Sequence, residues 1–404
     1  MRHLWANRAF RILWVGQLVS TLGNNLYYLA LPWYILTVTG SRIDLVLTGM
    51  ALRLPAVAQL VVGVFVDRWP KKTVMLAADG VRLLVSGSLG WAAAQHAPVG
   101  VLLGGVVLFE LAGTFFSPAD SAVLPLVVPP EDLRAAKGVQ QSSAAIAGLA
   151  GKLLGGPLLT LLGAPLLFLT NAASFVTSLG SLWGVRVDEE PSGSRDPRAS
   201  FRAEWTAGLR AIWQSPGLSR LIGSGLLVNF GVSSLTIVLT TWVKVGDHGT
   251  AVLLSVVSGA FLAGSVVGGV AFGGLSRRFP TGVPRWSTLG FGVCIGLVGA
   301  VRHPLWTISC MGMAGLCDAL FNSWVGTYLV QQTPAPLRGR VFSTFGGLML
   351  ATGPVGLAVF GAVLTSGIAL PLIFGMMGAF AVVAGLVTRP ARPDVVSDHL
   401  IQSH

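Results

Sequence analysis

Charged residues are scarce in this sequence. Only 11% of its 404 residues are Asp, Glu, Lys or Arg, against about 25% in soluble domains. Hydrophobic residues supply 53% of the chain. Because so few charges cannot cover the surface of a water-soluble globule, the composition excludes a soluble fold and predicts a membrane protein.

Cysteine is rare as well. Cys294, Cys310 and Cys317 lie in apolar segments without CxxC or Cys/His spacing, so neither a zinc site nor a disulfide framework is predicted. We expect no metal and no cofactor. The arginine-rich start lacks a short apolar core followed by a small-residue cleavage site, which predicts a retained first helix and not a signal peptide.

Apolar runs fill most of the chain. A membrane-spanning helix needs about 20 mainly apolar residues, and breaks at charge clusters and Pro/Gly turns leave twelve such segments. The prediction is an all-α membrane protein with twelve transmembrane helices at 10–38, 45–66, 73–95, 98–120, 135–162, 164–185, 217–243, 250–275, 286–302, 304–329, 340–365 and 367–388.

One long polar stretch separates the sixth segment from the seventh. It predicts an N-terminal six-helix half at 1–186, a cytoplasmic linker at 187–215, a C-terminal six-helix half at 216–390 and a cytoplasmic tail at 391–404. The other loops are short and leave little room for a catalytic domain. This organisation favours transport over enzymatic chemistry.

The formal net charge of +11 would suggest a nucleic-acid partner in a soluble protein. Here the basic residues are distributed unequally between the loops of the two sides of the membrane. The loops of one side carry only Arg42, Lys244 and Arg302. An excess of Lys and Arg marks the cytoplasmic side. We therefore expect a bacterial inner-membrane protein with both termini in the cytoplasm and no nucleic-acid partner.

An internal repeat with an offset of 204 residues divides the chain in two. The sequence PEDLR at 130–134 resembles PAPLR at 334–338, and Asn25 falls on Asn229. Duplicated halves predict a substrate site at their interface near the middle of the bilayer.

The stretch Gly63–Lys72 resembles the G-x-x-x-D-R-x-G-R-[RK] signature of the major facilitator superfamily, with Pro70 in place of the usual glycine. Further resemblance to its macrolide-efflux and siderophore-export branch lies in 10–17, 30–33, 53–55 and 118–125. The resemblance implies the major facilitator fold, with two pseudo-symmetric halves.

The same resemblance implies a cytoplasmic charge network that stabilises the outward-facing state. Such a network biases an equilibrium because its charge-assisted bonds exist in one state only. The alternative is that these residues only anchor helix ends. The members of the predicted charge network are Gly63, Asp67, Arg68, Lys71, Lys72, Asp79, Arg82 and Asp120.

Glu110, Lys152 and Asp318 lie inside predicted spans and away from the proposed network, and a charge there costs about 3 kcal/mol and is a functional candidate by default. Glu110 lies about 16 Å deep, and desolvation there suits a group that gains and loses a proton. Lys152 either pairs permanently with Glu110 or responds to protons or substrate. Asp318 either lines the C-terminal half of the cavity or caps an arginine such as Arg338.

The first and seventh segments carry polar and aromatic residues that predict a largely apolar cavity with scattered polar anchors. Lipid-facing positions are the alternative for each aromatic. The candidates for this cavity are Asn24, Asn25, Tyr28, Trp33, Asn229 and Phe230.

Together these features predict a monomeric, proton-coupled exporter of a hydrophobic or amphiphilic small molecule that works by alternating access within membrane lipids. The resemblance supplies the direction and the coupling. The alternatives are a lipid or lysolipid flippase and a non-transporting membrane sensor with the same fold. An enzyme is not expected, because no nucleophile–base or metal-ligand grouping recurs in the spans.

Overall fold

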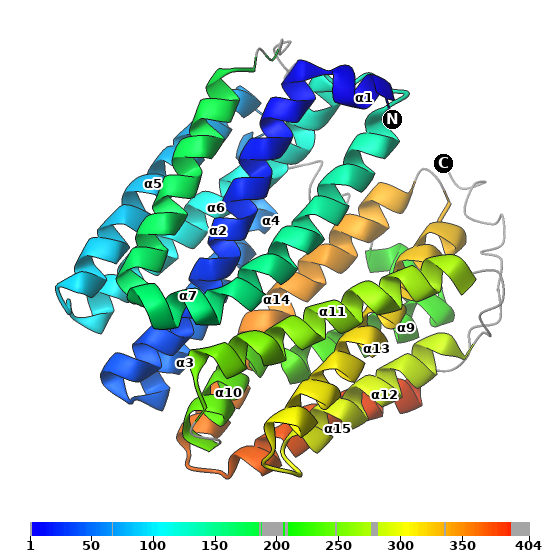
Figure 1. The fold of residues 1–404 in the computed structure, drawn as a ribbon. Helices are drawn as coiled ribbons and strands as arrows, with labels where there is room; N and C mark the ends of the chain where they lie inside the picture. Colours follow the sequence, from blue (N-terminus) through cyan, green and yellow to red (C-terminus); the bar gives the residue numbers. More distant parts are fainter. Residues whose placement is uncertain are drawn as a thin grey trace. The chain divides into compact units, whose positions relative to one another are not determined.

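A computed structural model describes residues 2–66, 68–185, 187, 205–206, 209–246, 249–275, 282–334 and 337–388. These residues form helices and no strand (Figure 1). The helices are α1 (Arg2–Ala6), α2 (Arg8–Thr39), α3 (Arg42–Arg53), η1 (Leu54–Ala58), α4 (Gln59–Val66), α5 (Lys71–Ala94), α6 (Val99–Val127), α7 (Leu133–Trp183), α9 (Pro216–Val232), α10 (Leu235–Thr241), η2 (Trp242–Gly246), α11 (Ala251–Leu275), α12 (Val283–Val298), α13 (Pro304–Gln332), α14 (Arg338–Thr365) and α15 (Leu370–Val387).

Within the described residues, nine helical stretches are long and apolar enough to span a membrane. One of them is the 51-residue α7, in which Gly163 has non-helical backbone angles and separates two spanning halves. α2 is long enough at 32 residues but carries more polar side chains, and α12 is a shorter apolar helix. The chain is an all-α membrane protein, and these helices are consistent with twelve spans.

Local sequence fixes several helix ends. The Asn7 side chain accepts a hydrogen bond from the Phe10 N–H at the start of α2, and Ser41 caps α3 in the same way. Such N-caps satisfy backbone donors that lack a partner in the first turn. Gly40 ends α2 in the left-handed conformation at φ 64°, which glycine adopts without a steric penalty.

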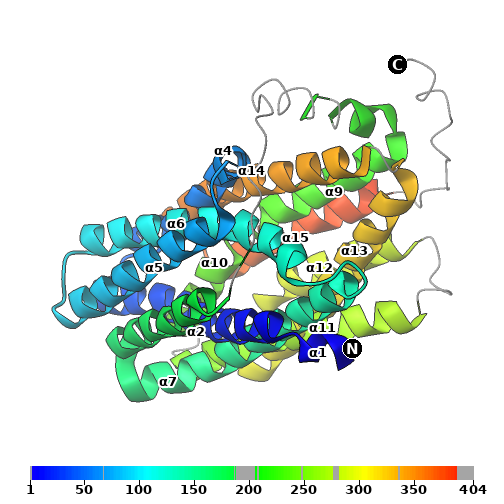
Figure 2. The same ribbon diagram turned by 90° about the horizontal axis from the view of Figure 1, so that it is seen from above.

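Contacts between Cα atoms divide the chain into two compact units, Met1–Arg195 with Leu239–Gly259 and Asp196–Val238 with Ala260–His404. In the first unit α2 and α5 both pack along α7, and α5 and α3 pack along α6. The paths of α2 and α7 lie side by side in both views (Figures 1 and 2). Glycine permits the close approach, because a Cβ at Gly16 would lie 2.1 Å from the Ser181 Oγ.

The second unit repeats this packing order. α9 packs against α14 and α15, while α12 packs against α13 and α15. In this comparison α9 corresponds to α2, and α14 and α15 correspond to the first and second halves of α7. In the same way α12 corresponds to α5, and α13 corresponds to α6. At the α12–α15 crossing, a Cβ on Gly292 would lie 2.7 Å from the Gly378 carbonyl oxygen. The repeated contacts support the internal duplication that the sequence predicts.

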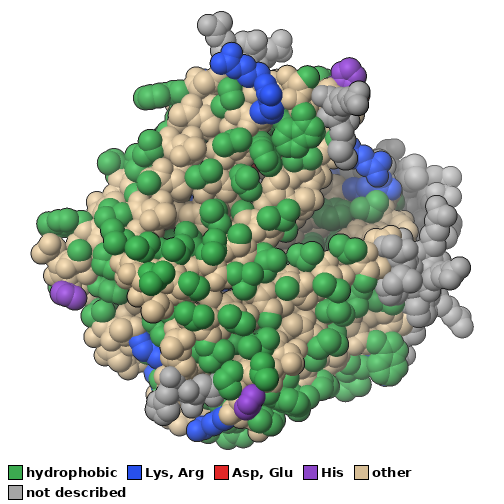
Figure 3. Space-filling model, viewed as in Figure 1, with side chains coloured by type: hydrophobic (Ala, Val, Ile, Leu, Met, Phe, Trp, Pro, Cys, Tyr) green, Lys and Arg blue, Asp and Glu red, His purple; other side chains and the backbone are tan. Residues whose placement is uncertain are grey.

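Hydrophobic side chains dominate the face shown in Figure 3, and Lys and Arg lie toward its edges. Large apolar residues are exposed on the spanning helices, with Leu84 70% and Leu161 79% accessible. A soluble protein rarely exposes so much contiguous apolar surface, whereas lipid tails solvate it.

Candidate functional site

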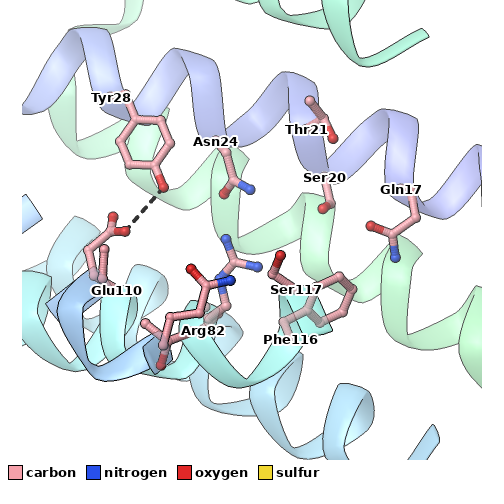
Figure 4. A pocket seen from close by; sticks show the side chains of 13 residues that line it. Gln17, Ser20, Thr21, Asn24, Tyr28, Arg82, Glu110, Phe116 and Ser117 are labelled. Atoms are coloured by element: carbon pink, nitrogen blue, oxygen red, sulfur yellow. Dashed lines mark hydrogen bonds between the residues drawn. The ribbon is translucent and has the colours of Figure 1, made fainter. Parts of the chain in front are cut away.

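A polar pocket of about 310 Å³ lies within the first unit. Side chains from α2, α5 and α6 converge on it (Figure 4). Ten of its thirteen lining residues are polar, so it is less apolar than the sequence predicts. The lining residues are Gln17, Ser20, Thr21, Asn24, Tyr28, Ala56, Gln59, Arg82, Glu110, Gly113, Thr114, Phe116 and Ser117.

Glu110 lies on α6 and faces this pocket. Its Oε2 accepts a hydrogen bond of 3.3 Å from the Tyr28 hydroxyl of α2 (Figure 4). Its Oε1 is buried and has no hydrogen-bond partner among the described residues. The pocket therefore contains a carboxyl oxygen able to accept one further hydrogen bond or a proton.

Arg82, a predicted member of the cytoplasmic network, lies in the second half of α5's first four turns and faces the pocket. It is about 16 Å along α5 from Lys71, it lines the pocket, and its side chain is only 8% exposed. Its Nη1 lies 3.6 Å from Asp79 Oδ1, and Asp79 Oδ2 accepts a 2.6 Å hydrogen bond from Ser178. Asp120 is close enough to interact electrostatically with Asp79.

Three phenylalanine rings surround the Arg82 guanidinium. The Cζ atom is 4.6 Å from the ring centroid of Phe175, 4.8 Å from that of Phe109 and 5.9 Å from that of Phe116. Aromatic faces attract a cation, and more strongly when water is excluded. The rings and Asp79 together hold a cation that would otherwise be costly inside the bilayer.

The remaining members of the predicted charge network lie around the turn between α4 and α5. Asp67 lies outside the described residues, Gly63 is in α4, and Arg68 is exposed. Lys71 donates hydrogen bonds to the carbonyl oxygens of residues 66 and 69, and Lys72 donates one to that of residue 185. These bonds lie at helix ends, and with Asp67 outside the described residues the network stays a prediction.

The other intramembrane candidates, Lys152 and Asp318, are not among the residues that line the pocket. No ion pair joins Lys152 to Glu110 in the described part of the chain, and Arg53 is near enough to Lys152 to interact with it electrostatically. Asp318 interacts with Asn322 on its own helix. Arg338 donates to the Thr333 carbonyl oxygen, and no described contact joins it to Asp318.

Among the predicted cavity residues, Asn24 and Tyr28 line the pocket. The others make packing contacts. Asn25 donates a hydrogen bond to the Thr21 carbonyl oxygen, and Trp33 lies under the Lys244 ammonium. Asn229 donates hydrogen bonds to the Met349 carbonyl oxygen and to the Thr352 hydroxyl. Phe230 packs against Phe360 and Phe380.

The sequence interpretation missed the rest of the pocket lining on α2. Gln17, Ser20 and Thr21 precede Asn24 and Tyr28 with spacings of three, one, three and four residues. That spacing places them on one helical face. A polar stripe with this period inside a predicted span is the signal that would have found the pocket.

The match to known proteins covers nearly the whole chain. Residues 13–346 match the family model described as Major Facilitator Superfamily. "Macrolide efflux protein A" of Streptococcus pyogenes is 28% identical over 86% of this chain and 87% of its own length. "Enterobactin exporter EntS" of Citrobacter koseri is 28% identical over 89% of this chain and 85% of its own length.

Solved structures show the same fold. The crystal structure of a point mutant of the nucleoside transporter NupG aligns with a TM-score of 0.77 over 94% of this chain and 99% of that chain, at 12% identity. Proteins of the Major Facilitator Superfamily move solutes through a membrane, which agrees with the prediction of a transporter and not an enzyme. The family model, the helical architecture and the repeated packing lead to one conclusion: this multi-pass membrane protein belongs to the Major Facilitator Superfamily.

Proposed function

We propose that this protein is a proton-coupled exporter of a hydrophobic or amphiphilic small molecule in a bacterial inner membrane, with both termini in the cytoplasm. Export is supported by the names of its relatives, which include a macrolide efflux protein, an enterobactin exporter and a multidrug efflux pump. Alternating access between two six-helix halves would move the cargo.

Glu110 carries the proposal of proton coupling. It lies inside a spanning helix, faces a pocket and has a buried oxygen without a partner. Burial penalises a charged carboxylate, so a proton or a bound ligand group lowers the cost of keeping this side chain inside the protein. A carboxyl that alternates between those two conditions couples proton movement to cargo movement.

The conformational change needs an element whose stability differs between states. We assign this role to two charges between α4 and α5, Asp67 and Arg68, together with Asp79 and Arg82 further along α5 and Asp120 on α6. The Asp79–Arg82 contact shows that part of the set is paired in this structure. Loss of such contacts on rocking of the halves would shift the equilibrium between the two access states.

The test measures internal pH in proteoliposomes that contain the purified protein and receive lipophilic cations, macrolides or siderophores. Wild type should give cargo-dependent proton flux. Glu110→Gln should reduce the cargo-dependent proton flux at least tenfold, because the amide cannot exchange a proton. Glu131→Gln is the matched control, since Glu131 is an exposed acid before α7 and its variant should behave as wild type.

Two outcomes would contradict the proposal. Flux that persists unchanged in Glu110→Gln would remove this residue from the coupling step. Absence of flux with every cargo, together with movement of labelled lipid in the same vesicles, would favour a flippase.

A further inference from the structure

The pocket of the first unit has the chemistry of a binding site for hydroxyl groups. Four residues that line it each carry a buried polar atom without a hydrogen-bond partner among the described residues: Gln17 Nε2, Asn24 Oδ1, Arg82 Nε and Glu110 Oε1. Native proteins satisfy nearly all such atoms, because each unsatisfied one costs about 1–3 kcal/mol. Four unpartnered polar atoms on the residues of a single pocket therefore indicate a site that binds a ligand.

These atoms are balanced in kind. Gln17 Nε2 and Arg82 Nε donate hydrogen bonds, whereas Asn24 Oδ1 and Glu110 Oε1 accept them. A hydroxyl group both donates and accepts, so several hydroxyls on one ring or chain satisfy this mixture. An apolar ligand would leave all four atoms unpaired, and a ligand with acceptors alone would leave two.

The charges of the site leave little preference for a strongly ionic ligand. Arg82 is already neutralised by Asp79 and surrounded by three aromatic rings. Glu110 already receives the Tyr28 hydroxyl and lies within electrostatic range of Arg82. The neutral hydroxyls and amides of Ser20, Thr21, Gln59, Thr114 and Ser117 complete the lining.

The size of the pocket limits what it holds. A volume of about 310 Å³ is at the lower end of the range for small-molecule sites. The pocket therefore suits a head group and not a whole drug-sized molecule. We infer that it binds the hydroxyl-rich head group, such as a glycosyl unit, of an amphiphilic cargo. This inference rests on the proposed function and adds the chemical class of the cargo to it.

The test uses octyl β-D-glucoside below its micelle-forming concentration and its tetra-O-methyl ether, which keeps the ring and the tail but has no hydroxyl donors. Binding of the radiolabelled compounds is measured on the full-length protein in lipid nanodiscs, with protein-free nanodiscs as background. Saturable binding of the glucoside is expected, with the ether at least tenfold weaker.

Variants locate the binding. Gln17→Met and Asn24→Leu keep the side-chain size but remove hydrogen-bonding atoms, and each should weaken glucoside binding about fivefold to tenfold. Gln141→Met is the matched control, because Gln141 is an exposed glutamine on α7 outside the pocket, and it should bind as wild type. The comparison of glucoside and ether in wild type does not depend on the folding of any variant.

The inference would be overturned by a lack of saturable glucoside binding, by equal binding of glucoside and ether, or by unchanged binding in both pocket variants. Tighter binding of tetraphenylphosphonium, a cation without hydroxyls, with loss in Glu110→Gln, would show that the pocket selects charge instead. If the glucoside-binding test fails while cargo-dependent proton flux is intact, the head-group assignment alone is rejected. Loss of all flux in the earlier assay would reject the proposed function itself.

Discussion

At the scale of single residues, Arg82 and Asp79 form a buried ion pair in the first unit. Both side chains are buried, and the Asp79 side chain is 0% exposed. Removing one partner from a buried ion pair is more destabilising than removing both, because the remaining charge has no compensation. Asp120 nearby would add repulsion to an uncompensated Asp79.

We therefore expect Arg82→Met to destabilise the protein by about 3 kcal/mol or more. The double variant Asp79→Asn with Arg82→Met should recover part of that loss. The apparent melting temperature of the purified protein in detergent measures both effects. Arg134→Met, at an exposed arginine, should leave the melting temperature within a degree or two of wild type. A double variant less stable than Arg82→Met would show that the pair is not the stabilising contact.

At the scale of elements, α7 is two helices joined by one backbone distortion. Gly163 has φ 76° and ψ 164°, a conformation that residues with a Cβ rarely adopt. Pro165 follows two positions later and favours a break in the helix, because proline lacks the N–H donor. The predicted boundary between the fifth and sixth spans, at 162–164, coincides with this position.

Gly163→Ala should lower stability by about 1–3 kcal/mol, since alanine must adopt the strained conformation or distort the turn. Gly180→Ala is the matched control on the same helix, because nothing lies within 4 Å of its added Cβ and alanine favours the helix. Thermal unfolding of the two variants should shift in opposite directions. Equal shifts would mean that the backbone at Gly163 is not a constraint.

At the scale of the whole molecule, the same packing order occurs in each unit. The offset of 204 residues predicts this, because duplicated sequences keep the same buried faces. The charge pattern makes a separate prediction about the two sides of the membrane, which the positive-inside rule derives from loops alone.

That orientation predicts which loops meet the outside of the cell. With the three native cysteines replaced by serine, Gln95→Cys between α5 and α6 should react with a membrane-impermeant maleimide in intact cells. Glu131→Cys before α7 should react only after the membrane is opened, although both residues are exposed in the structure. Labelling with the opposite pattern would invert the proposed topology.

Hydropathy and turn residues alone were enough to establish the helical membrane class and to predict the spans and the internal repeat. These properties depend on hydropathy over about 20 residues and on turn residues, which are local in the chain. Glu110 was also identifiable, because any acid inside an apolar span is conspicuous.

Which side chains meet depends on how the helices pack, and the sequence did not reveal it. Arg82 and Glu110 are on different helices, and sequence depth alone paired Glu110 with Lys152, although the described contacts join it to Tyr28. The polar pocket was hidden for the same reason, since its lining comes from α2, α5, α6 and the segment near η1. Helix rotation and crossing set those distances, and they depend on packing between segments far apart in the chain.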